Sequence, residues 1–344
     1  MRAVTYQAPG EVRVEEKPDP EVGSPDEAVV RVEATGVCGS DLHLYHGRIK
    51  IEQGFTLGHE YVGTVVAAGD DVTSVKEGDR VLGAFLTACG ECFFCRRGLF
   101  HKCDRGRVFG HGSTLGSLQG AQADLLLVPR ADLTLRLVPE GLTDEVALFA
   151  GDVMGTGYHA VQALEIEPGG SVAVLGLGPV GLCAVQVAKA AGAETVLAVD
   201  TVEDRLAMAK SFGAQPLHLT EDDVRGAVKE ATEGRGVDGA IDAVGNPEAL
   251  DMACRLARKA GVVSATGVYS TPIDLHMGIV WIKSLTLRSG QANVIAHLDP
   301  VLAQLSSGEL DPSPLVTHHM SLDEAPEAYE TYDRREALKI VMRP

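Results

Sequence analysis

The pattern of apolar and polar positions changes once along this chain. Before Thr143, short runs alternate apolar with charged side chains, as at Val30, Val32 and Ala34. Such alternation is typical of half-buried strands, and turns rich in Gly, Pro and Asp separate the runs. We therefore expect an all-β region up to Thr143, where a capping Thr followed by two acidic residues predicts the start of a helix.

From Ser171 onward, runs with strand character alternate with runs of helical period. This succession predicts a parallel, doubly wound sheet covered by helices, and therefore an α/β fold class for this part. After Ser289 the regularity fades, although residues 321–324 have the form of a capping box and residues 337–342 that of a closing strand. The expected strands are Ser171–Gly176, Thr195–Asp200, Val237–Val244 and Gly261–Val268, and the expected helices are Pro179–Ala191, Glu203–Phe212 and Pro247–Lys259.

Composition and charge narrow the possible partners. The chain has 344 residues, which suggests about two domains of roughly 100–200 residues each. A net charge of −18 argues against nucleic acid or an anionic membrane as a partner. No apolar run approaches the ~18 residues of a membrane span, and the chain begins in a strand-like run rather than an export signal. We expect a cytoplasmic protein that acts on a small molecule.

The stretch from Cys38 to Gly63 gathers groups that bind metal and move protons. Thiolate and imidazole are ligands that Zn²⁺ prefers, so Cys38 and His59 are the first candidate pair, and a catalytic zinc needs only three protein ligands. Ser40 and His43, close behind the Cys, could carry a proton away from the open position. Spacing does not fix the third ligand, for which three side chains are candidates: Glu60, Asp152 and His159.

A second group of cysteines predicts a structural metal site. Four thiols at close spacing can satisfy a closed tetrahedral zinc site, which leaves no position for substrate. Disulfides are the alternative, but without an export signal the pattern favours metal. The four predicted ligands of this structural zinc are Cys89, Cys92, Cys95 and Cys103.

A glycine-rich loop after the first strand of the α/β region predicts a dinucleotide site. Gly176 permits the tight turn, Gly178 lets a pyrophosphate approach the backbone, and Gly181 allows close packing of the helix on the strand. Asp200 ends the next strand, where a carboxylate accepts a ribose 2′-hydroxyl and repels a 2′-phosphate, so we predict NAD rather than NADP. Arg205 complicates this choice because it could tolerate a phosphate. The expected cofactor-binding residues are Gly176, Gly178, Pro179, Val180, Gly181, Asp200, Arg205, Val244 and Val268.

Taken together, these motifs resemble the zinc-dependent medium-chain alcohol dehydrogenase family, and the resemblance covers essentially the whole chain. It implies a GroES-like β-rich catalytic domain over residues 1–150, to which residues 290–344 return, and a Rossmann NAD-binding domain over residues 151–289. The sequence of the cysteine lobe favours the formaldehyde-dehydrogenase-like branch. The motifs that carry the resemblance are Gly58-His59-Glu60 with Gly63 and Gly69, Cys38 with Ser40, Asp41 and His43, the four-cysteine group, and Gly176 to Gly181.

The resemblance also assigns roles to single residues. It implies that Asp152 is the third permanent ligand beside Cys38 and His59, and that Glu60 can move onto the metal. It further implies that Asp41 orients His59, that Ser40 and His43 form the proton relay, and that Phe85 lines the substrate pocket. Lys339 is expected at the cofactor pyrophosphate.

The resulting hypothesis is an NAD-dependent zinc dehydrogenase of EC 1.1.1 type, with one catalytic and one structural zinc per chain. It would transfer hydride between NAD and an alcohol, aldehyde or ketone, and it would form a homodimer or homotetramer. Two alternatives stay open: an aldehyde dismutase that keeps its NAD bound, and a non-catalytic protein that binds zinc and a nucleotide.

Overall fold

The computed structural model describes residues 1–269 and 272–344, and these residues form two compact units. The first unit contains Met1–Gly155 and Asn293–Pro344, and the second contains Thr156–Ala292. The limits predicted from the sequence, 150 and 290, lie within a few residues of these boundaries. Among the described residues, no helix combines the length and the apolar character that crossing a bilayer requires.

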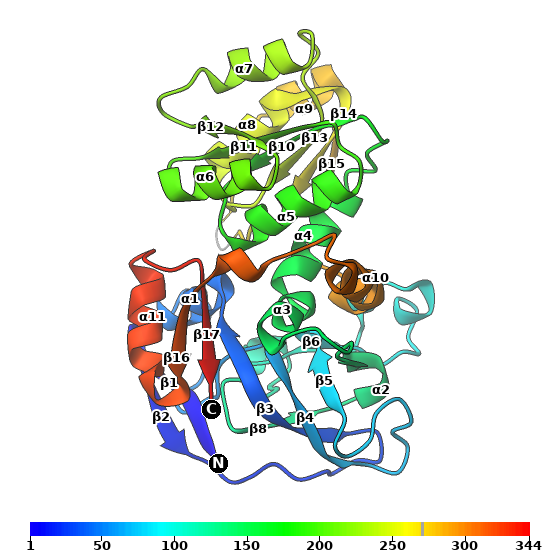
Figure 1. The fold of residues 1–344 in the computed structure, drawn as a ribbon, viewed down its shortest axis with the longest axis vertical. Helices are drawn as coiled ribbons and strands as arrows, with labels where there is room; N and C mark the ends of the chain where they lie inside the picture. The colour runs from blue at the N-terminus through cyan, green and yellow to red at the C-terminus, as the bar shows by residue number, and fades with distance from the viewer. Residues whose placement is uncertain (270–271) are drawn as a thin grey trace. The chain divides into compact units, whose positions relative to one another are not determined.

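The first unit is organised around a mostly antiparallel sheet (Figure 1). The order of its main path is β16-β17-β3-β4-β5-β9, and β8 also pairs with β3. Its strands, with those of two small two-stranded sheets, are β1 Arg2–Ala8, β2 Glu11–Glu16, β3 Ala28–Val37, β4 Tyr61–Ala68, β5 Arg80–Gly83, β6 Leu86–Thr87, β7 Arg107–Val108, β8 Leu125–Val128, β9 Leu135–Leu137, β16 Val316–Ser321 and β17 Lys339–Arg343.

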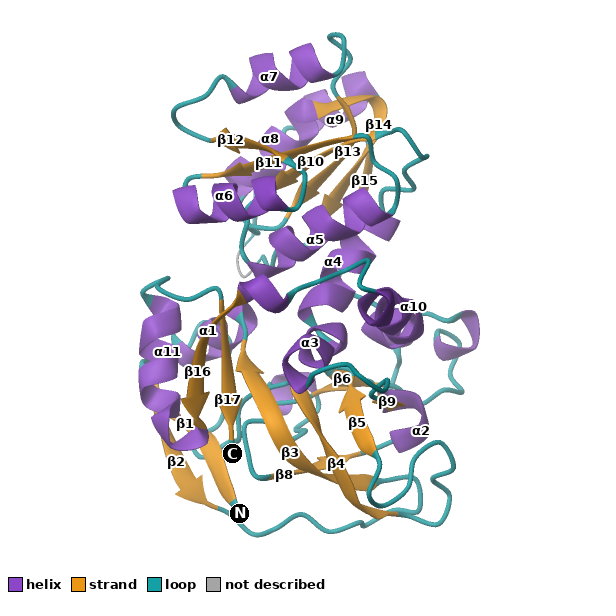
Figure 2. Ribbon diagram, in the orientation of Figure 1, coloured by secondary structure: helices purple, strands orange, loops and turns teal. Residues whose placement is uncertain are grey.

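Helices of the first unit flank this sheet (Figure 2). One apolar cluster joins β1, β2 and β17 to α1 and α11, and includes the fully buried Leu44 and Tyr329. A second cluster lies around β3, β4 and β5. The helices are α1 Gly39–Tyr45, α2 Ala131–Thr134, α3 Asp144–Leu148, α10 Val294–Ser307 and α11 Ala325–Asp333, and α4 Val153–Gln162 spans the boundary between the units.

The second unit is a six-stranded parallel sheet with the order β12-β11-β10-β13-β14-β15. In chain order this is 3-2-1-4-5-6, the Rossmann arrangement, whose order reverses between β10 and β13. Helices α5 and α6 cover one face, and α8 and α9 lie on the other (Figure 1). The elements are β10 Ser171–Leu175, α5 Pro179–Ala190, β11 Thr195–Asp200, α6 Glu203–Ser211, β12 Gln215–His218, α7 Val224–Ala231, β13 Val237–Asp242, α8 Pro247–Leu256, β14 Ala257–Ala265, α9 Met277–Lys283 and β15 Thr286–Ser289.

The structure confirms the predicted α/β succession and corrects two details. The helix expected to run to Lys259 ends at Leu256, because β14 begins at Ala257 and pairs with β13 from there. The region expected to be all-β also contains the short helix α2 and, directly after β3, helix α1. Asp41 explains this helix, since its carboxylate accepts a hydrogen bond from the backbone N–H of Cys38 at the N-terminus.

Candidate active site

The candidate active site lies where three neighbouring strands of the first unit end. Strand β3 ends at Val37 just before Cys38, β4 begins just after Glu60, and β17 begins at Lys339. Both β4 and β17 are antiparallel neighbours of β3, with Tyr61 opposite Thr35 and Ile340 opposite Val37. The antiparallel register therefore brings residues 38, 60 and 339 to the same edge of the sheet.

Four potential metal ligands meet at this edge. The ligand atoms of Cys38, His59, Glu60 and Asp152 all lie within 4.8 Å of one another. His59 Nε2 is 3.3 Å from Asp152 Oδ2, and nitrogen or oxygen ligands bound to a tetrahedral zinc at about 2.0–2.1 Å would lie about 3.3–3.4 Å apart. The donor set therefore fits a zinc ion. Of the three candidate third ligands, the structure gathers Glu60 and Asp152 here, whereas His159 is not part of the group.

Asp41 connects two of these ligands. Its Oδ2 accepts the hydrogen bond from the backbone N–H of Cys38 at 3.0 Å, and its Oδ1 lies 3.2 Å from His59 Nδ1. A carboxylate at Nδ1 leaves Nε2 as the ring atom available to a metal. Asp41 is completely buried. Its position agrees with the orienting role that the family resemblance implies.

The charges in the cluster also favour a bound cation. Burial opposes protonation of His59, but the carboxylates of Asp41 and Asp152 raise the pKa of this imidazole well above its usual value. Burial and the nearby carboxylate of Asp152 raise the pKa of the Cys38 thiol. Both effects express the same excess of negative charge in a buried space, which a divalent cation would offset.

Lys339 occupies a different place from the one predicted. Its ammonium donates to both carboxylate oxygens of Glu60 and to the carbonyl of Val37, and the side chain is completely buried. These three acceptors use all three N–H groups. Gly36 makes room for the pair, since a Cβ there would lie 2.1 Å from Glu60 Oε2. The predicted contact of Lys339 with the cofactor pyrophosphate does not agree with this arrangement, because no N–H group is left for a phosphate.

The predicted proton relay lies on α1. Ser40 Oγ is 3.4 Å from His59 Nε2, so the hydroxyl adjoins the atom that would bind the metal. His43 follows Ser40 by three residues, a spacing that puts both side chains on one side of a helix. Partial burial, with Arg48 and His46 nearby, lowers the pKa of His43 and favours its neutral form. Phe85 places its ring edge-on to His59, with the ring centroids 6.2 Å apart.

The sequence reasoning missed one residue of this site, His111. Its ring also stands edge-on to His59, with the centroids 5.3 Å apart, and only 6% of the residue is exposed. Burial and the neighbouring His59 lower the pKa of His111. The available signal was a His between two glycines, Gly110 and Gly112, both of which adopt positive φ angles.

The four cysteines of the second group converge as predicted. The Sγ atoms of Cys89 and Cys95 are 3.9 Å apart and those of Cys92 and Cys103 are 4.0 Å apart, close to the about 3.8 Å edge of a zinc tetrahedron with 2.3 Å bonds. All four thiols are free of disulfides. Burial would raise the pKa of Cys89, but backbone N–H groups of Glu91 and Cys92 lower it to about 6. Backbone N–H groups also lower the pKa of Cys92, whereas burial raises the pKa of Cys95 and of Cys103.

In the second unit, the glycine-rich loop joins β10 to α5. Gly176 has a φ of +86°, and a Cβ at Gly181 would lie 1.8 Å from the carbonyl oxygen of Gly176. Contacts within the chain therefore require a glycine at both positions. A Cβ at Gly178, in contrast, would meet nothing within 4 Å. Gly178 is the N-cap of α5, followed by Pro179 and the N–H groups of the first turn. This open space at a helix N-terminus fits a pyrophosphate.

Asp200 already has backbone partners in this loop. Its Oδ2 accepts from the N–H of Leu177 at 2.6 Å, and its Oδ1 accepts from Thr201 and Val202. A carboxylate offers about four acceptor positions, so it retains capacity for a ribose hydroxyl. The remaining predicted cofactor residues lie at the same end of the sheet: Arg205 in the first turn of α6, and the largely exposed Val244 and Val268 after β13 and β14.

The fold and the donor set together define a zinc-dependent dehydrogenase. Residues 24–140 match the model of the alcohol dehydrogenase GroES-like domain, and residues 179–304 match that of the zinc-binding dehydrogenase. A probable zinc-binding alcohol dehydrogenase of Mycobacterium tuberculosis is 41% identical over 100% of this chain and 89% of its own length. The chain therefore belongs to the zinc-binding alcohol dehydrogenase family, which confirms the family, fold class and hydride-transfer function inferred from the sequence.

Solved structures agree with this assignment. The alcohol dehydrogenase TADH from Thermus sp. ATN1 is 44% identical, with a TM-score of 0.97 and coverage of 100% of this chain and 99% of that one. A putative zinc-binding dehydrogenase from Sinorhizobium meliloti, solved with bound NADP, is 29% identical, with a TM-score of 0.89 and coverage of 100% and 99%.

The position of Lys339 leads to a test. Lys339→Met leaves Glu60 buried without its counter-ion, and removing one partner of a buried pair costs about 3–5 kcal/mol. We expect the free energy of unfolding, measured with urea, to fall by about this amount, while the Kd for NAD measured by calorimetry stays the same. The double variant Lys339→Met with Glu60→Leu should regain part of the loss. Normal stability with weaker NAD binding would instead support the pyrophosphate role.

Proposed function

We propose that this protein is an NAD-dependent zinc alcohol dehydrogenase that oxidises a small alcohol or reduces the corresponding aldehyde or ketone. The observation that carries the proposal is the group of Cys38, His59 and Asp152, with the Ser40 hydroxyl 3.4 Å from His59 Nε2. A closed structural site would have no use for a hydroxyl beside a ligand atom. The alternatives of a dismutase and of a non-catalytic protein have no comparable observation in their favour.

The residues of the chain divide the work as follows. Cys38, His59 and Asp152 would hold the zinc, and Glu60 would stay paired with Lys339 beside it. When bound, zinc supplies a Lewis acid for the substrate oxygen and NAD supplies the hydride acceptor. Ser40 takes the proton of the alcohol and His43 passes it on, a role that the lowered pKa of His43 suits because a neutral imidazole can accept a proton. Phe85 provides an apolar wall beside His59.

A matched pair of cysteine variants, Cys38→Ser and Cys103→Ser, tests whether each chain binds two zinc ions and what each site does. We expect Cys38→Ser to lose one zinc and all NADH formation with a panel of small alcohols, while its Kd for NAD is retained. Cys103→Ser should also lose one zinc, but its main effect should be a lower Tm, at about 2–4 °C per kcal/mol lost. Metal content by mass spectrometry and turnover are the measurements. Full activity of Cys38→Ser, or silence of the wild-type enzyme across the panel, would contradict the proposal.

The preference for NAD rests on the charge of Asp200. Because its carboxylate also holds the backbone of the loop, the test needs a variant that keeps the shape. Asp200→Asn removes the charge that repels a 2′-phosphate, so we expect the ratio of kcat/KM for NADP over NAD to rise about 10–100-fold. Asp200→Ala is the comparison, since loss of loop support alone lowers both values together. A common fall in both variants would assign Asp200 to the loop and not to cofactor choice.

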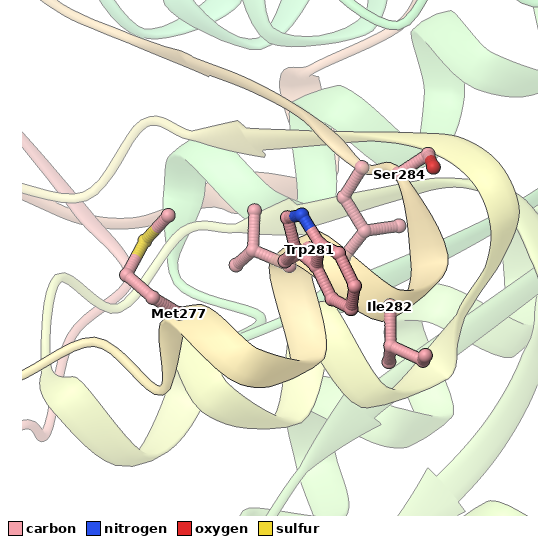
Figure 3. A pocket seen from close by; sticks show the side chains of 6 residues that line it. Met277, Trp281, Ile282 and Ser284 are labelled. Atoms are coloured by element: carbon pink, nitrogen blue, oxygen red, sulfur yellow. The ribbon is translucent and has the colours of Figure 1, made fainter.

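A homo-oligomer is part of the same proposal. Strand β15 is an edge of the six-stranded sheet. Helix α9, which precedes β15 in the chain and contacts β14, exposes Trp281 (78%), Ile282 (68%) and Met277 (58%), and these side chains line a pocket (Figure 3). Residues 276–289 contain no acidic residue in a chain of net charge −18. An unpaired edge strand can pair with its own copy across a two-fold axis, and this apolar, non-acidic face suits a second copy.

Sedimentation velocity tests this assembly. We expect the wild-type chain to sediment as a dimer or tetramer, and Trp281→Glu to shift it toward the monomer, because the variant buries a charge in the contact. Leu219→Glu, at another exposed apolar position of the second unit, is the control and should leave the assembly unchanged. A monomeric wild type, or an unchanged Trp281→Glu assembly, would place the contact elsewhere or remove it.

A further inference from the structure

His111 is a side chain of the active site to which neither the relay nor the ligand set assigns a task. Its ring centroid lies 5.3 Å from that of His59, and it interacts electrostatically with Asp41 and Asp152. It is not one of the four groups whose ligand atoms lie within 4.8 Å of one another. Its position is therefore beside the ligand cluster rather than within it.

The two ring nitrogens of His111 have different surroundings. Nδ1 lies 2.9 Å from the carbonyl oxygen of Phe109, and since a carbonyl can only accept, Nδ1 carries a proton and donates it. Nε2 makes no hydrogen bond to any residue of the described ranges 1–269 and 272–344, and it is not among the atoms sealed from solvent without a partner. Nε2 is thus the atom that can reach a ligand.

The loop that carries His111 approaches the metal-binding segment closely. Gly110 has a φ of +70°, and a Cβ there would lie 2.5 Å from the carbonyl oxygen of Gly58, the residue before His59. On the other side, a Cβ at Gly112 would lie 2.8 Å from a carboxylate oxygen of Glu52. The backbone contact of Gly110 with Gly58 places the His111 ring beside the ligand cluster, and a defined position of this kind is a condition for selective recognition.

His59 therefore has two unlike neighbours, the apolar ring of Phe85 and the polar ring of His111. We infer that His111 Nε2 binds a second hydroxyl group on the substrate, so that the enzyme prefers vicinal diols over simple alcohols of the same length. In a vicinal diol the second oxygen is three bonds from the reacting oxygen, which keeps it next to the side chains that adjoin the ligand cluster. This inference rests on the proposed function and specifies its substrate class.

A hydroxyl group can both donate and accept, so the contact does not depend on which proton state Nε2 adopts. A site that pairs a substrate hydroxyl discriminates strongly against its loss, because a bound substrate that lacks the hydroxyl covers the protein group without giving it a partner. For one neutral hydrogen bond the effect is about 10–100-fold in relative kcat/KM.

Three variants, His111→Asn, His111→Gln and His111→Phe, separate recognition of the hydroxyl from a structural role of His111. Asn places its amide nitrogen where His has Nδ1, and so keeps the bond to Phe109 while losing Nε2. Gln places an amide group where His has Nε2, and Phe removes both nitrogens while keeping a ring. The readout is the ratio of kcat/KM for 1,2-propanediol to that for 1-propanol, with zinc content measured for each variant.

We expect the wild-type ratio to exceed one, to fall about 10–100-fold in His111→Asn and His111→Phe, and to be partly kept in His111→Gln. A structural role predicts the reverse, with Asn tolerated, Gln impaired and both substrates affected together. An unchanged ratio or loss of zinc from His111→Asn would overturn the inference. Should the wild type turn over neither these substrates nor any alcohol of the panel, the proposed function fails. Saturation-transfer NMR of the two alcohols with wild type and His111→Asn still decides whether His111 Nε2 binds the second hydroxyl.

Discussion

The structure of the first unit depends on how it accommodates acidic groups crowded into one buried space. Cys38, Glu60 and Asp152 bring three groups that become anionic to within 4.8 Å of one another around a single imidazole. Burying unpaired charges is costly, and like charges at this distance repel. Lys339 balances Glu60, and a divalent cation bound by the other ligands would balance the rest. The donor set therefore suits a cation, and the raised pKa values of His59 and Cys38 are a response to the same crowded negative charge.

This constraint explains the path of the chain. The first sheet supplies Cys38 after β3 and Glu60 before β4, but a buried counter-ion for Glu60 must come from elsewhere. The chain returns from the Rossmann unit to add β17 beside β3, and the first residue of β17 is Lys339. Gly36 on β3 leaves the space that the ion pair occupies. The C-terminal segment thus completes the electrostatics of the site as well as the sheet.

Much of this could be predicted from the sequence, because the ligands and the nucleotide loop leave local patterns. Cys38 and His59 adjoin strand ends, and the four cysteines lie on one short loop. The third ligand could not be predicted from spacing, which left Glu60, Asp152 and His159 as equally good candidates. Their distances from Cys38 in space depend on tertiary contacts. Lys339 was assigned to a phosphate because a sequence does not reveal that a distant carboxylate will bury it. His111 was missed because the ring that it stands against, His59, lies 52 positions earlier in the numbering, and a His between two glycines has no regular period.

In the glycine-rich loop, some glycines are required by contacts within the chain and one is not. Gly176 and Gly181 are required by contacts within the chain, because a Cβ at either position would meet Val244 or the carbonyl of Gly176 at 2.5 Å or less. Gly178 has no such contact, so the fold alone gives no reason for a glycine there. Asp200 also holds the loop, because its carboxylate accepts a hydrogen bond from the N–H of Leu177, the residue between Gly176 and Gly178. A loop held at both ends, with one glycine that no contact among the described residues requires, would be preorganised for a pyrophosphate.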